Sequence, residues 1–220
     1  MNSHMTIKRF IEKVLNRIEK KYLFPRFAKK HSKKLKTKEF TVISNNCWGG
    51  VLYEYYGLQK QSPTIGSYFY AEDYVRFCKD LKGYLNKELT FINPTESRHF
   101  EDLHRKGQDN VIIGKLGDVE IVFLHYADKD IILEKWKRRI QRINWDKVIL
   151  KFSYQNQCSD ELIKEYEQID DYKKIILVGE KITDSDDEII YKRRNGKVTI
   201  DEVENFTKYI DVTKIINERL

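Results

Sequence analysis

The chain of 220 residues is poor in cysteine, with three in total. Cys47, Cys78 and Cys158 are an odd number at unrelated spacings, which fits neither a disulfide framework nor a paired-cysteine zinc site. The scarcity argues against a small disulfide-bonded secreted domain. It favours the reducing environment of the cytoplasm.

Long apolar runs are also missing. No stretch approaches the roughly 20 apolar residues that span a bilayer, and the N-terminal residues lack the apolar region of a secretory signal. We therefore expect a cytoplasmic protein. The sequence also lacks a P-loop, a dinucleotide-binding glycine pattern and a His-Glu-x-x-His motif, so no metal site is predicted.

The net charge of +7 is concentrated at one end of the chain. Residues 1–38 contain 13 Lys or Arg and two acidic residues, so this arm carries +11 and the remainder −4. A core that binds nucleic acid is expected to carry its own basic face. The acidic balance of residues 39–220 therefore argues against nucleic acid as a partner.

The basic arm of residues 1–38 is predicted to be an appendage to a single domain of residues 39–220. Residues 1–5 resemble an expression-vector remnant and are excluded from the fold prediction. Apolar residues recur every three or four positions over residues 6–24, and Pro25 ends this amphipathic helix. One interpretation of residues 6–38 is peripheral binding to the anionic inner face of a membrane. A helix packed on its own domain explains the pattern equally well.

From Glu39 onward, strand and helix patterns alternate. The strands at 119–124, 147–152 and 174–179 are near-continuous apolar runs, typical of strands covered on both faces. Further strands are predicted at 40–44, 89–92, 111–113 and 188–191, and helices at 48–57, 71–84, 129–142, 159–168 and, broken, 201–217. This order predicts an α/β fold, a three-layer sandwich with a mostly parallel central sheet, plus the N-terminal amphipathic helix.

The turn after the first predicted strand holds the main catalytic candidate, Cys47. It precedes a predicted helix, whose N-terminus would lower the pKa of a thiol. The side-chain amides of Asn45 and Asn46, with the backbone N–H groups of Trp48 and Gly49, are candidates to stabilise an oxyanion. The alternative interpretation is a small buried cysteine in a tight turn.

His125 is the candidate general base, because it follows the predicted strand 119–124. If that strand and the strand before Cys47 are parallel in one sheet, their carboxyl ends lie on the same edge. The imidazole would then accept a proton from a thiol or a substrate hydroxyl, and Asp128 would orient the ring. A histidine that simply hydrogen-bonds at a strand end is the alternative.

Two further groups are candidates for substrate binding. Hydroxyls of Ser62 and Thr64, in a turn fixed by Pro63, can bind a phosphate or a sugar. Arg138 and Arg142 are four residues apart on a predicted helix and can hold a phosphate or carboxylate together. A structured loop and a solvated helix face are the corresponding alternatives.

Taken together, several motifs resemble a bacterial family of unknown function usually labelled exopolysaccharide or capsular polysaccharide biosynthesis proteins. The resemblance covers about residues 38–220 and implies a sugar-polymer context. The motifs are Ile43-Ser-Asn-Asn-Cys-Trp-Gly-Gly50, Ser62-Pro-Thr-Ile-Gly66, Phe123-Leu-His-Tyr126, Trp136-x-x-Arg-x-x-Arg-Ile-Asn-Trp145 and Tyr209-Ile-Asp-Val212.

The Asn-Cys pair at the end of the first strand is also similar to capsule acetyltransferases of the SGNH-like type. In those enzymes a Gly-Asn-Cys-Gln turn lies beside a coenzyme A site. This sequence departs from that pattern, because Ser44 replaces the glycine and Trp48 replaces the glutamine. The similarity implies acetyl-coenzyme A as the cofactor, by analogy.

The resulting hypothesis is an O-acetyltransferase that modifies a sugar polymer or its lipid-linked precursor. Cys47 forms a thioester or lines the acyl pocket, His125 is the base, and the rings of Trp48, Tyr68 and Tyr70 contact the sugar. One alternative is a glycosyl- or phosphosugar transferase that uses a nucleotide sugar, with residues 184–187 as a metal-binding acidic loop. Another is a non-catalytic scaffold of capsule assembly.

Overall fold

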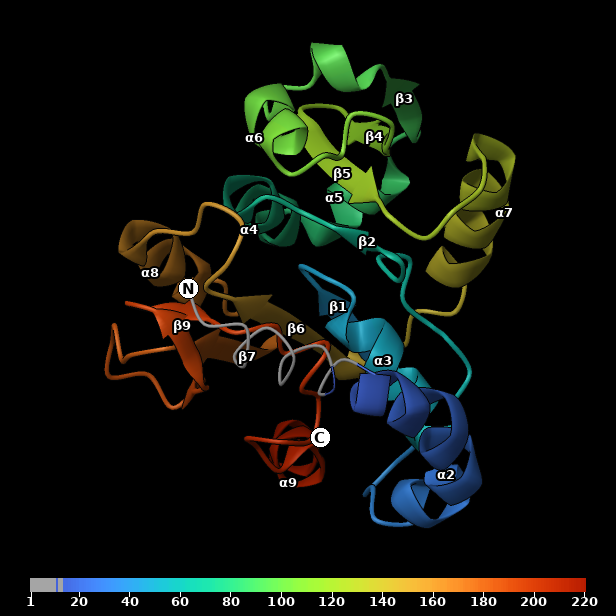
Figure 1. Cartoon of the computed structure of the whole chain (residues 1–220), viewed down its shortest axis with the longest axis vertical. Helices are drawn as coiled ribbons and strands as arrows, with labels where there is room; N and C mark the ends of the chain where they lie inside the picture. Colours follow the sequence, from blue (N-terminus) through green and yellow to red (C-terminus); the bar gives the residue numbers. More distant parts are fainter. Residues whose placement is uncertain (1–10, 12–13) are drawn as a thin grey trace.

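The computed structural model describes residue 11 and residues 14–220, and it is a mixed α/β fold (Figure 1). The strands are β1 Thr41–Ser44, β2 Ser67–Tyr68, β3 Thr90–Ile92, β4 Ile112–Leu116, β5 Val119–Phe123, β6 Val148–Ser153, β7 Lys173–Val178, β8 Glu188–Ile190, β9 Arg193–Asn195 and β10 Val198–Thr199. The helices are η1 Glu19–Leu23, α2 Phe24–Ser32, α3 Trp48–Tyr56, α4 Ala71–Lys79, α5 Leu81–Asn86, η2 Pro94–Glu96, α6 Phe100–Arg105, α7 Lys129–Ile140, η3 Trp145–Lys147, α8 Asp160–Glu167 and α9 Val212–Arg219.

A parallel sheet in the order β1-β6-β7-β8 forms one half of the fold. Thr41 pairs with Val148 and Ser44 with Lys151, so β1 and β6 end together at one edge. Every residue of β1 and β6 is buried, and for β6 this agrees with the burial predicted from its continuous apolar run. The mostly parallel sheet of the prediction is therefore confirmed.

Helices cover both faces of this parallel sheet. Val42 and Ile149 share an apolar cluster with α3 and α9, whereas their neighbours Ile43 and Leu150 share another with α4 and α8. Successive strand residues point to opposite faces, so the helices that follow β1 and β6 lie on opposite sides. Adjacent strands whose following helices diverge create a crevice at their carboxyl ends, the usual ligand position in α/β folds.

The second half is an antiparallel sheet in the order β2-β5-β4-β3, which the sequence did not predict. We expected the run at 119–124 in the parallel sheet, and that assignment was wrong. Gly117, at φ 61°, and Asp118 form a tight turn that returns β5 antiparallel to β4. The run is continuously apolar because both of its faces are covered: Ile121 and Phe123 belong to one cluster and Val122 to another.

Two predicted helices have different bounds in the structure. The helix expected at 71–84 is interrupted at Asp80, whose side chain accepts a hydrogen bond from the backbone of Gly83 and begins α5. Of the helix expected at 201–217, only Val212–Arg219 forms. The Asp201 carboxylate accepts the backbone N–H groups of Val203 and Glu204, which holds residues 201–204 in a turn instead.

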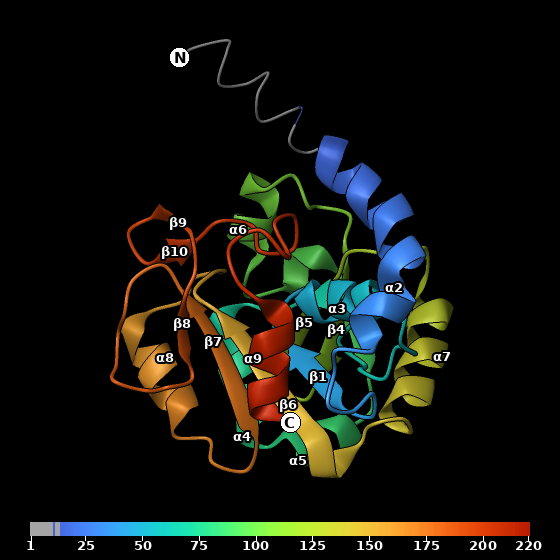
Figure 2. The same cartoon turned by 90° about the horizontal axis from the view of Figure 1, so that it is seen from below.

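The N-terminal helix is present, and its two ends differ in environment. Phe24 is 3% exposed and packs with α3 and Phe206. The residues before it project beyond the rest of the described chain (Figure 2). Several apolar side chains there are exposed: Ile11, Val14, Leu15, Ile18, Tyr22 and Leu23. Within residues 11 and 14–220, no helix is long and apolar enough to cross a membrane.

Candidate functional site

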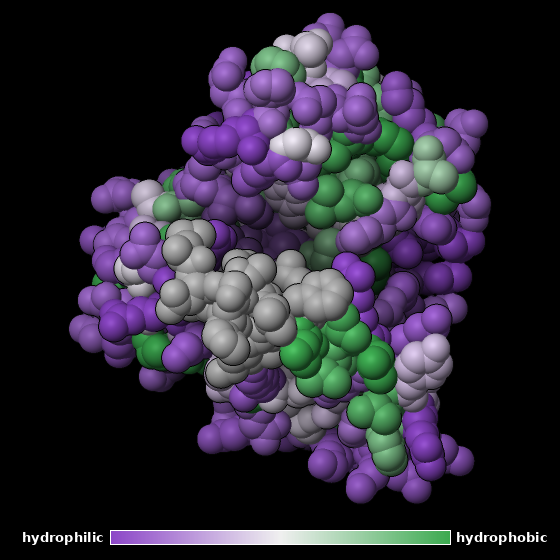
Figure 3. Space-filling view, in the orientation of Figure 1, coloured by the Kyte–Doolittle hydropathy of each residue, from purple (hydrophilic) through white to green (hydrophobic). Residues whose placement is uncertain are grey.

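Cys47 and His125 line the same cleft. One cavity of about 280 Å³ is lined by both residues together with Ile65 and Arg139. A second cavity, of about 320 Å³, shares Cys47, His125 and Val203 with the first and continues to Gln155. Figure 3 shows this face hollowed between the two halves of the molecule. The cleft therefore lies at the carboxyl edge of the parallel sheet, where the antiparallel sheet meets it.

The two residues come from different sheets, which the sequence did not predict. Cys47 follows β1 of the parallel sheet, but His125 follows β5 of the antiparallel sheet. The carbonyl of Gly66 accepts the backbone N–H groups of Leu124 at 3.0 Å and His125 at 3.3 Å, which fixes the chain after β5. The parallel-edge argument for their proximity was wrong, although both residues border one cavity.

The Cys47 thiol is held as a neutral group. Cys47 is the N-cap of α3, and its Sγ donates to the backbone oxygen of Ser67 at 3.8 Å. Burial raises the pKa of Cys47 to about 11, which outweighs the nearby cation of Lys151. A thiol with a raised pKa is a poor nucleophile at neutral pH. The prediction of a thiol activated by the helix is therefore not supported by this environment.

His125 has an exposed side chain, and Asp128 does not orient it by any hydrogen bond found among the described residues. Asp128 is instead the N-cap of α7, where its carboxylate accepts the backbone N–H of Ile131 at 2.8 Å. The His125 side chain therefore borders the cavity without a hydrogen bond from Asp128 to orient it. It is free to meet a substrate hydroxyl, as a general base requires.

Asn46 lines the 320 Å³ cavity, whereas Asn45 lines none of the cavities described here, and both side-chain amides donate hydrogen bonds. The Nδ2 group of Asn46 donates to Glu202 at 2.6 Å, and its Oδ1 accepts the backbone N–H of Trp48 at 3.1 Å. Asn45 is fully buried and donates from Nδ2 to the Ser153 carbonyl at 3.4 Å. These amides hold the turn in place, so their predicted role as oxyanion donors is not supported by this environment.

A buried ion pair lies behind the asparagines. Lys151 and Glu202 are both fully buried, with Nζ and Oε1 2.7 Å apart. Burial lowers the pKa of Lys151. Although burial alone would raise the pKa of Glu202, Lys151 and hydrogen bonds from Ser153 and Asn46 hold it below its ordinary value. The pair ties the segment after β10 to the ends of β1 and β6.

Of the predicted sugar-contacting rings, only Tyr68 lines the cleft. Its hydroxyl donates to Gln108 at 2.7 Å. Trp48 is fully buried, and Tyr70 is 1% exposed with its hydroxyl donated to Asp102. Neither ring offers a free face to a sugar.

Ser62 and Thr64 are also structural. Both are buried, their hydroxyls lie 3.0 Å apart, and Thr64 Oγ1 accepts the backbone N–H of Ser44 at 3.3 Å. They fix the turn before β2 against the end of β1. They are therefore not available to bind a phosphate or sugar.

The predicted arginine pair does not border the cleft, but its neighbour does. Arg138 is exposed and bonded to Glu134 at 2.6 Å, and Arg142 does not line the cavities described above. Arg139 is 7% exposed and lines the 280 Å³ cavity. The sequence carried a signal for it, since Ile132, Trp136 and Arg139 recur at helical spacing and all three are buried.

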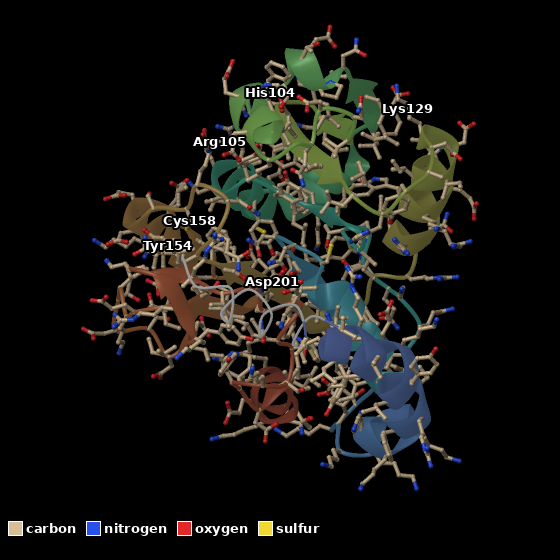
Figure 4. The ribbon with its side chains drawn as sticks, viewed as in Figure 1. His104, Arg105, Lys129, Tyr154, Cys158 and Asp201 are labelled. Carbon is tan, nitrogen blue, oxygen red and sulfur yellow. The ribbon has the colours of Figure 1, made fainter. Side chains whose placement is uncertain are left out.

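The cleft continues beyond Gln155 into a third cavity of about 470 Å³. Arg105, Tyr154, Cys158 and Asp201 are among the residues around it (Figure 4). The turn after β6 has two consecutive residues in the left-handed region that disfavours side chains, Asn156 at φ 51° and Gln157 at φ 64°. Such conformations concentrate at functional sites, and sequence alone did not reveal them.

The described residues contain no group of three or more His, Cys, Asp or Glu positioned to hold a metal ion. The acidic loop at 184–187 fits this result, because the side chain of Asp184 is fully exposed and contacts Lys181 at 3.6 Å.

Comparison with known proteins identifies the family. The sequence model for "Domain of unknown function (DUF1919)" matches residues 18–218. The chain belongs to this family. The expectation of a family of unknown function is thus confirmed, whereas the link to exopolysaccharide stays a prediction. The DUF1919 match begins inside the basic arm, at Ile18 of the N-terminal helix and six residues before α2.

One relative is a protein of Haemophilus influenzae (strain ATCC 51907 / DSM 11121 / KW20 / Rd) described as "Uncharacterized protein". It is 27% identical over 145 residues, which cover 66% of this chain and 64% of the relative. The chain therefore aligns with less than two thirds of that protein's length.

Proposed function

We propose that this DUF1919 protein is an acyltransferase that transfers an acetyl group from acetyl-coenzyme A to a hydroxyl of a sugar polymer or its lipid-linked precursor. The observation that carries the proposal is the shared cleft. An exposed imidazole, the first turn of α3 and a neutral thiol border one cavity at the carboxyl edge of the parallel sheet.

The proposed reaction needs one base and one oxyanion site. His125 accepts the proton of the sugar hydroxyl as its oxygen attacks the thioester carbonyl carbon. The N–H groups of Gly49 and Gly50 stabilise the oxyanion of the tetrahedral intermediate. Collapse of the intermediate breaks the carbon–sulfur bond, and the departing thiolate takes the proton from His125. The products are a sugar ester and coenzyme A.

Cys47 lines the acyl pocket in this proposal and forms no thioester. Its raised pKa and its hydrogen bond to the Ser67 carbonyl favour a neutral thiol beside the acyl group. The sequence left two roles for Cys47, a thioester-forming nucleophile or a wall of the acyl pocket, and its environment favours the wall.

The test follows coenzyme A release in the presence of acetyl-coenzyme A and candidate sugar acceptors. We expect His125→Ala to lower kcat/KM by about 10²- to 10⁴-fold, the usual contribution of a general base. His104→Ala is the matched control, since His104 is exposed on α6 and lines none of these cavities. Equal activity of the His125→Ala and unmodified proteins would refute the proposal.

Thermal shifts separate the proposal from its alternatives. A ligand that binds only the folded state at a hundredfold excess over its Kd adds about 2.7 kcal/mol to the free energy of unfolding. A shift with acetyl-coenzyme A supports the acyltransferase. A shift with nucleotide sugars alone supports a glycosyl- or phosphosugar transferase, and no shift with either class supports the scaffold.

The proposed cellular location is the anionic inner face of a membrane, reached through the N-terminal helix. Its exposed apolar side chains Leu15, Ile18 and Tyr22 lie among Arg17, Lys20 and Lys21. Apolar residues beside cations are what an anionic lipid surface attracts. Lys20 also donates to the Val203 carbonyl at the cleft, so the arm would bring the cleft close to a lipid-linked acceptor.

A further inference from the structure

Arg139 carries a buried charge that no carboxylate of the described residues neutralises. Its Nη1 donates to the Ile65 carbonyl at 3.2 Å and to the Tyr126 hydroxyl at 2.8 Å. Within the part of the chain that the structure describes, no Asp or Glu forms an ion pair with it, and the side chain is 7% exposed. A buried cation without an anion is costly, so this position calls for a negatively charged partner.

A second cation lies on the same face of α7. Lys135 is four residues before Arg139, and both line the 280 Å³ cavity. Like charges at this spacing repel each other. Lys135 lies over the Tyr126 ring at 5.2 Å and has no carboxylate partner among the described residues. Lys60 borders the same cavity, but Glu54 neutralises it at 2.7 Å.

The first turn of α3 also lines this cavity. Gly50 lines it, and Asn46 Oδ1 accepts the N–H of Trp48, so the N–H groups of Gly49 and Gly50 are the candidate donors of this turn. A Cβ at position 50 would lie 3.1 Å from Ile65, so glycine permits the close approach of the turn. A helix N-terminus adds backbone donors and a positive dipole to the two cations.

We propose that Lys135, Arg139 and the first turn of α3 bind a phosphate group of the ligand. The chemical class is a phosphate or diphosphate ester. Coenzyme A, a nucleotide sugar and a lipid-linked sugar diphosphate all carry such a group. The inference deepens the proposed function and rests on it for the identity of the ligand. The anion site itself is tested with inorganic pyrophosphate.

The first experiment titrates pyrophosphate into the full chain by calorimetry at constant ionic strength. We expect saturable binding, weakened at least tenfold by Lys135→Gln, which corresponds to about 1.4 kcal/mol of binding free energy. Lys137→Gln is the matched control, because it removes the same charge from the exposed face of α7. Equal affinities of the Lys135→Gln and Lys137→Gln proteins would overturn the site.

Arg139→Gln serves as a second variant, with a folding check by circular dichroism because Arg139 also holds the Ile65 carbonyl. Arg139→Lys keeps the charge but not the two-pronged geometry. If Arg139→Gln does not fold, Arg139→Lys supplies the measurement. We expect pyrophosphate affinity in the order unmodified, Arg139→Lys, Arg139→Gln, and no dependence on position 139 would contradict the site.

Competition separates the ligand from the site. Displacement of bound pyrophosphate by coenzyme A, by a uridine diphosphate sugar or by a short polyprenyl diphosphate identifies the source of the phosphate. Pyrophosphate binding that depends on Lys135, without acetyl transfer, keeps this inference and removes the proposed function. Acetyl transfer by a protein that does not bind pyrophosphate would keep the proposed function and overturn the anion site.

Discussion

Cys47 shows how far a single residue can be interpreted from sequence. Its position between a strand and a helix was predicted correctly, since Cys47 follows β1 and precedes α3. Its protonation state was not predictable, because the pKa depends on burial by segments far away in the sequence. For Arg139, helical spacing with Ile132 and Trp136 indicates which side of α7 it shares, but which residues cover that side depends on distant segments.

The state of Cys47 can be measured directly. With a pKa of about 11, about one thiol in a thousand is ionised at pH 8. We expect alkylation of Cys47 by iodoacetamide to be slow at neutral pH and to accelerate steadily as the pH rises toward 11. Mass spectrometry of peptides separates it from Cys78 and Cys158. Rapid labelling at pH 7 would show an activated thiolate.

Cys47→Ser tests the same assignment through activity. The proposed chemistry uses Cys47 only as a wall of the acyl pocket, so kcat should fall by less than about tenfold, in contrast to the loss of a covalent nucleophile. The readout is coenzyme A release with the same acceptor. Loss of all activity, with an acetylated Cys47 trapped in the unmodified protein, would restore the thioester mechanism.

At the scale of elements, local sequence predicted most of the helices and strands but not how the strands pair. The boundaries of β6, β7, α7 and α8 follow from apolar periodicity and from caps such as Ser159. The antiparallel partner of β5 was missed because a two-residue turn at Gly117 and Asp118 decides it. The two-residue strand β2 is too short to leave a pattern.

The buried pair between β6 and the segment after β10 should be essential for stability. Lys151→Met leaves Glu202 buried without its cation, and we expect a loss of about 3–5 kcal/mol in the free energy of unfolding. Urea denaturation measures it. Lys147→Met, on exposed η3, is the control and should cost little. A loss below 1 kcal/mol for Lys151→Met would mean that the pair contributes little.

The exposed face of the N-terminal helix gives a binding prediction. We expect the full chain to co-sediment with vesicles containing anionic lipid, and the double substitution Leu15→Ser with Leu23→Ser to weaken binding more than tenfold through lost apolar burial. Ile190→Ser removes an equally exposed side chain from β8 as the control. Equal binding of all three proteins would exclude this face as the membrane contact.

At the scale of the whole molecule, one apolar cluster joins the two halves. It contains Ile43 and Leu150 of the parallel sheet and Ile121 and Phe123 of the antiparallel sheet. We therefore expect one cooperative unfolding transition in urea, with far-ultraviolet circular dichroism and tryptophan fluorescence changing together. Two separated transitions would show that the halves fold independently.

The position of His125 on one sheet and Cys47 on the other has a consequence for how such a protein can diversify. The Gly66 carbonyl holds the backbone of His125, and the Ser67 carbonyl accepts the hydrogen bond of the Cys47 thiol, so residues 66 and 67 help to position both groups. A small shift of these two residues would reshape the space between the imidazole and the thiol while both side chains stay the same. Substitutions that move these two residues are therefore expected to change the shape of the cleft without replacing either Cys47 or His125.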